Sequence, residues 1–123
     1  MPADRTAALA VLALRVAYGA ALILAPERLA GRWLGPDAAR APAQVPLRAL
    51  GAREVVLHAG ALLAARRGGS LRPWFAASIA GDLTDIASTI AGHRELPDGA
   101  VAATAAVAGA SALLSAGLAL RLP

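Results

Sequence analysis

Residues 99–120 have the sequence GAVAATAAVAGASALLSAGLAL, which runs for 22 residues without a charged side chain. About 20 apolar residues in one helix span the hydrocarbon core of a bilayer. A helix of an alanine-rich soluble bundle would show a polar face to water. This segment offers only the hydroxyls of Thr104, Ser111 and Ser115. It therefore predicts a transmembrane helix.

Three further apolar stretches precede this segment, and Pro and Gly residues mark the joints between them. We expect residues 1–123 to form a single integral membrane domain. Its fold class is all-α, a four-transmembrane-helix bundle with a short interfacial helix between spans one and two. The expected spans are approximately 6–25, 46–65, 71–92 and 99–120, with Pro46 opening the second. The short connection His93–Asp98 predicts an antiparallel hairpin of the last two spans.

The composition also indicates a membrane protein. Apolar residues make up 58% of the chain, against roughly 45–50% in soluble proteins. The net charge of +4 is the balance of 12 arginines and 8 acidic residues, since lysine is absent. Because there is no basic stripe and aromatic residues for base stacking make up only 3% of the chain, no nucleic-acid partner is expected, and membrane lipid is the expected partner. The absence of cysteine excludes disulfides and thiolate metal sites.

Arginine positions predict the orientation in the membrane. A cluster of three arginines, Arg66, Arg67 and Arg72, surrounds the joint between spans two and three. This cluster favours a multi-pass protein of the cell membrane with both termini in the cytoplasm. Because Arg15 interrupts the first apolar stretch and no cleavage site follows, we expect an uncleaved span and not a signal peptide.

The connection after the first span contains the expected interfacial helix, residues 26–34. Helical spacing would turn Leu29, Trp33 and Leu34 toward lipid, and the charged side chains of the segment toward water. Indole rings prefer the membrane interface, which agrees with the position of Trp33. An ordinary solvated loop is the alternative.

Ionisable residues interrupt the first three spans, where hydrocarbon makes them costly. They are Arg15, Arg48, Arg53, Glu54, His58, Asp82 and Asp85. Three arginines balance three carboxylates, so one interpretation is a buried salt-bridge network that fixes helix register. Arg53 could point across to span three. The titratable His58, one turn from Glu54, favours a polar cavity that binds a small molecule or passes protons.

Acid/base chemistry on a small lipophilic molecule suits two carboxylates one turn apart, because each raises the proton affinity of the other. The candidate catalytic residues are Asp82, Asp85, Glu54 and His58, and the candidate substrate-binding residues are Arg15, Tyr18, Arg48 and Arg53. An isomerase, a cyclase or an epoxide-opening enzyme would use such a site. No cofactor is expected, since no cofactor fingerprint is present. No metal is expected either, because the ligand spacing is wrong and nearby arginines repel cations.

Two other classes of function remain open. One is a proton-coupled small-molecule transporter acting as a dimer, which makes a homo-oligomer an option. Small four-helix drug transporters work around a carboxylate in their first span, whereas the first span here holds Arg15. The other is an accessory membrane subunit with a purely structural salt-bridge network.

Small residues predict where the helices pack closely. Gly19, which follows Tyr18, permits a close approach of another helix, and the small residues of span four predict a packing wall.

Three motifs together carry a resemblance to a known family. They are Ala25-Pro26-Glu27, Arg48-Ala-Leu-Gly51-Ala-Arg53-Glu54 and Gly81-Asp82-Leu-Thr-Asp85. The pattern resembles small bacterial and fungal four-span membrane proteins known only as a domain of unknown function. The resemblance covers most of the chain, from span one through span four. It implies the four-span fold and the position of the site, and it implies no activity.

Overall fold

The computed structural model describes residues 2–123 and is all-α, as expected. No strand occurs within these residues. The elements, in chain order, are α1 (Ala3–Leu24), α2 (Pro26–Leu34), the 3-10 helix η1 (Gly35–Ala39), α3 (Ala41–Arg66), α4 (Arg72–Ala91), the 3-10 helix η2 (His93–Glu95) and α5 (Ala100–Arg121).

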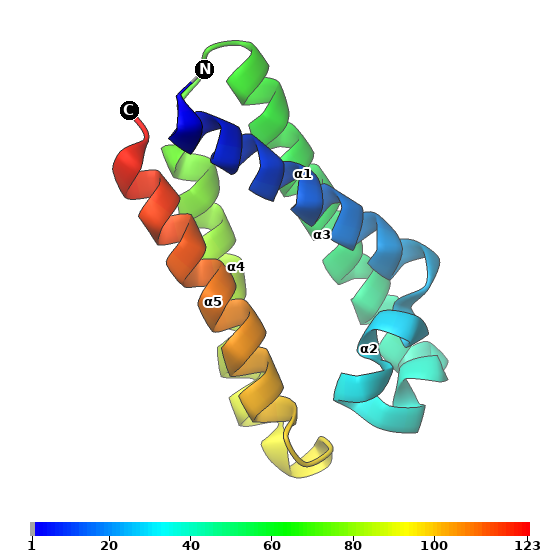
Figure 1. Ribbon diagram of the computed structural model, residues 1–123. Coiled ribbons are helices and arrows are strands. Elements are labelled where there is room, and N and C mark those ends of the chain that lie inside the picture. The colour runs from blue at the N-terminus through cyan, green and yellow to red at the C-terminus, as the bar shows by residue number, and fades with distance from the viewer. Residues whose placement is uncertain (1) are drawn as a thin grey trace.

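The helices form two halves, with α1 packed along α3 and α4 packed along α5 (Figure 1). The expected hairpin of the last two long helices is therefore confirmed. In the other half, α1 and α3 approach closely because Gly19 of α1 faces Gly51 of α3. A Cβ atom on Gly19 would lie 2.6 Å from the carbonyl oxygen of Gly51, and one on Gly51 would lie 2.5 Å from that of Gly19. Small residues allow such approaches of helix backbones.

The two halves share a core at one end of the molecule only. This core takes residues from all four long helices and their flanks: Ala8, Leu12, Ala61, Ala65, Leu71, Phe75, Leu118 and Leu122. At the other end, a separate core contains Leu22, Ala30, Ala38 and Leu47, all from the α1–α3 half and its connection. The halves consequently diverge toward the end that carries α2 (Figure 1).

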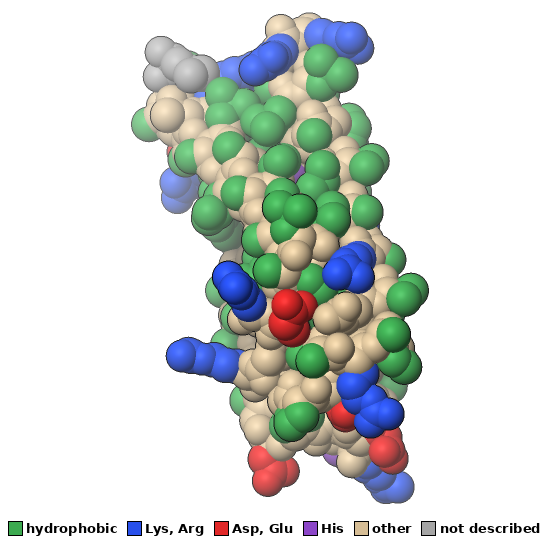
Figure 2. Space-filling model, turned by 90° about the vertical axis from the view of Figure 1, so that its right-hand side faces the viewer, with side chains coloured by type: hydrophobic (Ala, Val, Ile, Leu, Met, Phe, Trp, Pro, Cys, Tyr) green, Lys and Arg blue, Asp and Glu red, His purple; other side chains and the backbone are tan. Residues whose placement is uncertain are grey.

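Two helices, α1 and α5, are long and apolar enough to cross a membrane. Neither is a buried core helix, since the buried share of the most apolar part is 22% in α1 and 17% in α5. Hydrophobic side chains cover much of one face of the molecule, and its charged side chains lie at the top and in the lower half (Figure 2). The structure thus supports two candidate spans, and the expected second and third spans do not pass the same test.

The structure corrects the expected start of the second long helix and decides between helix and loop for residues 26–34. The second long helix begins at Ala41, so Pro46 lies inside it and does not open it. Pro42 occupies the early position, where a missing N–H leaves no bond unmade. Residues 26–34 form a helix and not a loop. However, Leu29 and Trp33 of this helix turn toward the space between the two halves.

Candidate functional site

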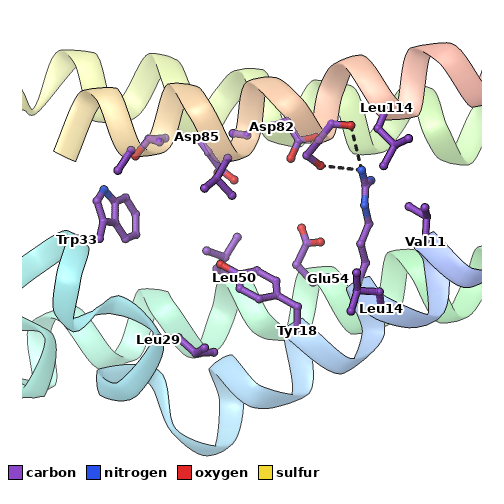
Figure 3. A pocket seen from close by; sticks show the side chains of 16 residues that line it. Val11, Leu14, Tyr18, Leu29, Trp33, Leu50, Glu54, Asp82, Asp85 and Leu114 are labelled. Atoms are coloured by element: carbon purple, nitrogen blue, oxygen red, sulfur yellow. Dashed lines mark hydrogen bonds between the residues drawn. The ribbon is translucent and has the colours of Figure 1, made fainter. Parts of the chain in front are cut away.

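A cavity of about 550 Å³ lies between the two halves, near the end where they diverge (Figure 3). All five α-helices contribute to its lining. Its mouth is apolar and opens sideways between α1 and α5, because Leu14 and Val107 line the cavity and are each 71% exposed. Three carboxylates, those of Glu54, Asp82 and Asp85, belong to the lining. The cavity is therefore amphipathic.

Arg53 binds two of these carboxylates and joins the two halves. Its Nη1 donates to Oδ1 of Asp85 at 3.3 Å and its Nη2 donates to Oδ2 at 3.0 Å, a two-point contact from α3 to α4. The same Nη2 donates to Oε1 of Glu54 at 3.1 Å. Gly81 leaves room for the guanidinium, since a Cβ atom there would lie 3.3 Å from Cζ of Arg53. The expectation that Arg53 points across to the following long helix is confirmed.

Arg15 binds the opposite wall and contacts no carboxylate within salt-bridge distance among residues 2–123. Its Nη2 donates to the carbonyl oxygen of Ser111 at 3.1 Å and to Oγ of Ser111 at 2.6 Å (Figure 3), and also to Oγ of Ser115 at 2.8 Å. These bonds hold α1 to α5. The small residues of this segment were expected to form a packing wall, and the structure shows that two of its hydroxyls also bind Arg15. The one-turn spacing of Ser111 and Ser115 places both hydroxyls on one face of the helix, and this was the signal in the sequence for a shared partner.

His58 lies behind the cavity wall and is only 1% exposed. Its Nδ1 is 2.8 Å from the carbonyl oxygen of Glu54, and its Nε2 is 2.8 Å from Oγ of Ser78 and 3.4 Å from Nη1 of Arg15. A carbonyl only accepts and a guanidinium only donates, so a neutral ring protonated at Nδ1 satisfies both contacts. The expected contact of His58 with Glu54 is present at 3.3 Å. His58 does not line the cavity, so its placement suits positioning better than contact with a substrate.

Arg48 lies outside the site. Its side chain is exposed, and its Nε donates to the carbonyl oxygen of Ile23 at 3.1 Å. The count of three cations against three anions therefore does not describe the surroundings of the cavity. Two arginines, Arg15 and Arg53, face three carboxylates. Tyr18, in contrast, lines the cavity as expected for a binding residue.

Asp82 is the carboxylate that this arrangement leaves unpaired. Within the described part of the chain it makes no salt bridge, and its Oδ2 is buried without a hydrogen-bond partner. Trp33, another lining residue, has its Nε1 donor buried without a partner. Leaving a buried polar group unsatisfied costs about 1–3 kcal/mol. Two residues of the cavity lining, Asp82 and Trp33, thus each carry a buried polar atom without a partner among the described residues.

The residues present do not form a metal centre. In residues 2–123, no three His, Asp or Glu side chains are grouped to hold a metal ion. The guanidinium of Arg53 already occupies the place between Glu54 and Asp85 that a cation would take.

We predict that Arg53→Gln destabilises the protein by about 2 kcal/mol, between the values for exposed and buried ion pairs, because it leaves Glu54 and Asp85 without a cation. The measurement is the loss of helical circular dichroism on titration with a denaturing detergent. The matched control is Arg48→Gln, which we expect to change stability by less than about 0.5 kcal/mol. Equal losses for both variants would contradict the assigned role of Arg53.

Comparisons of this chain with protein-family models, with curated proteins and with solved structures find no match. The resemblance to four-span membrane proteins therefore stays an expectation drawn from the sequence motifs.

Proposed function

We propose that this chain is a small polytopic membrane protein that binds a small lipophilic molecule in the cavity between its two halves. The observation that carries this proposal is the amphipathic lining. An apolar mouth opens between α1 and α5, and a carboxylate without an ion-pair partner, Asp82, lies in the wall. Ligand sites are typically apolar clefts with a few placed polar groups. A sideways opening suits a molecule that arrives from lipid.

Four membrane spans fit the distribution of charge better than two. The charged side chains in the middle of α3 and α4 turn toward each other, as the Arg53–Asp85 contact shows. The outer faces of the same helices expose large apolar side chains, including Val56 at 73% and Leu83 at 55%. Charges inside a membrane protein face its interior and pair there, while apolar side chains meet lipid. We therefore infer that α1, α3, α4 and α5 all span the membrane, with both termini in the cytoplasm.

Asp82 is the group best placed to give or accept a proton in this site. Arg53 holds both Glu54 and Asp85 in ion pairs, so these two carboxylates already have a partner. A positioned carboxyl group can transfer a proton to or from a reacting atom. The proposed activity is acid/base chemistry on the bound lipophile, of the isomerase, cyclase or epoxide-opening type, with Asp82 as the reacting group and Tyr18 as a binding residue.

A proton-coupled transporter is the second candidate, and the packing of the halves favours it. Their shared core lies at one end, whereas farther along they are joined by polar contacts and by a small contact of α2 with α5. Such an arrangement allows one half to move against the other about the shared end. Conversion of an added lipophile by purified protein would identify an enzyme, and flux driven by a pH gradient in liposomes would identify a transporter. If neither occurs, the polar contacts serve an accessory subunit.

We predict that cysteines placed in the connections will be labelled from opposite sides of the membrane. The chain has no natural cysteine, so single substitutions report without background. A membrane-impermeant maleimide should label Asp98→Cys in intact cells and Ser70→Cys only after permeabilisation. Labelling of both from outside would mean that only α1 and α5 cross the membrane. The reverse pattern would keep four spans and overturn the orientation.

We also predict that Val107→Phe weakens binding of pyrenemethanol, a neutral lipophilic probe, by at least about tenfold, because the larger ring fills the mouth of the cavity. Energy transfer from tryptophan to pyrene, measured in lipid nanodiscs against empty nanodiscs, reports binding. The control is Leu120→Phe, since Leu120 is exposed on α5 and does not line the cavity. If the two variants bind the probe equally, the cavity is not the binding site.

A further inference from the structure

We propose that the cavity selects lipophilic cations, meaning amphiphiles that carry one ammonium group on an apolar body. This inference rests on the proposed function, because it concerns the ligand of the same cavity. Four features of the site support it: the charge balance, the engagement of both arginines, the aromatic lining and the separation of the two unsatisfied groups.

The charge balance of the site is negative. The lining and its ion pairs contain Glu54, Asp82 and Asp85 against Arg15 and Arg53. Arg53 is shared by two of the carboxylates, and no arginine pairs with the third. A ligand ammonium beside Asp82 would supply the missing positive charge. In low-dielectric surroundings, a charge is tolerated when it is paired and hydrogen-bonded.

An anionic ligand would have to compete for both arginines of the site, because their terminal nitrogens already have hydrogen-bond partners. The Nη2 of Arg15 already donates to Ser111 and Ser115, and its Nη1 lies against His58. Both terminal nitrogens of Arg53 bind Asp85 or Glu54, and its Nε is buried without a partner among residues 2–123. A carboxylate or phosphate would have to displace one of these partners and would also meet the charge of Asp82. Like charges brought together in this way disfavour the wrong ligand.

The aromatic residues of the lining also favour a cation. Tyr18 and Trp33 lie in the cavity with Leu29 and Leu50 near them (Figure 3). The face of an aromatic ring attracts an ammonium group, most strongly where water is excluded. The aliphatic side chains would meet the apolar body of the same molecule.

The two unsatisfied groups lie toward different ends of the cavity. Trp33 lies at one end, and Asp82 lies nearer the other (Figure 3). The buried Nε1 of Trp33 is a donor, whereas the buried Oδ2 of Asp82 is an acceptor. The matching ligand carries its ammonium group toward Asp82 and its apolar body toward Trp33.

The test compares three probes that share one fluorophore and differ in charge: pyrenemethylammonium, pyrenemethanol and pyrenecarboxylate. Each is titrated into the full chain in zwitterionic nanodiscs at neutral pH, with empty nanodiscs as background. We expect the ammonium probe to bind at least about tenfold more tightly than the alcohol, and the carboxylate most weakly. In Asp82→Asn, the ammonium probe should lose its advantage, so that the ammonium and alcohol probes bind alike. The control Asp98→Asn removes the same charge from an exposed connection and should preserve the ranking.

Equal binding of ammonium and alcohol to the unaltered chain, or tightest binding of the carboxylate, would overturn the inference and leave the cavity as a site for lipophiles. An ammonium preference that survives Asp82→Asn would overturn the role of Asp82. If no probe binds, the proposed function fails together with the inference. Should Asp82→Asn not fold, the ranking of the three probes on the unaltered chain still decides the ligand class.

Discussion

Two arginines hold together halves of the molecule that share a hydrophobic core at one end and otherwise touch where α2 meets α5. Arg53 reaches from α3 to Asp85 of α4, and Arg15 reaches from α1 to two serines of α5. An ionised side chain in apolar surroundings must find such partners, because a lone charge there is costly. The positions of the carboxylates, the width of the cavity and the lack of a salt bridge at Asp82 within the described chain all depend on where these two guanidinium groups bind.

The cavity is the space that remains between the shared core and the diverging ends. Phe75 and Leu12 close one end of the molecule, while α2 brings Trp33 to the other. Arg15 binds hydroxyl and carbonyl oxygens and not a carboxylate. Asp82 therefore lies in the cavity wall without an arginine partner. A network built only to fix helix register would pair every charge. The unpaired Asp82 is the reason for proposing a ligand.

Sequence periodicity predicted contacts within a helix and failed for contacts that depend on how neighbouring helices are rotated. The Glu54–His58 contact follows from one-turn spacing, and the close approach at Gly19 follows from the missing side chain. Arg48 was expected in the site, but its long side chain reaches an exposed backbone carbonyl instead. The role of Ser111 depends on Arg15, which lies on a distant helix, and no single segment contains that information. The all-α class was predictable from composition and pattern, whereas the number of spans still rests on the proposal of four.

A crystal structure grown from a lipid phase would test the central claim, that Asp82 faces a ligand cavity and not an arginine. We predict that Arg15 is hydrogen-bonded to Ser111 and Ser115, that an open space lies between α1 and α5, and that electron density for a bound amphiphile lies beside Asp82. A direct salt bridge between Arg15 and Asp82, with the two halves closed and no cavity between them, would contradict it.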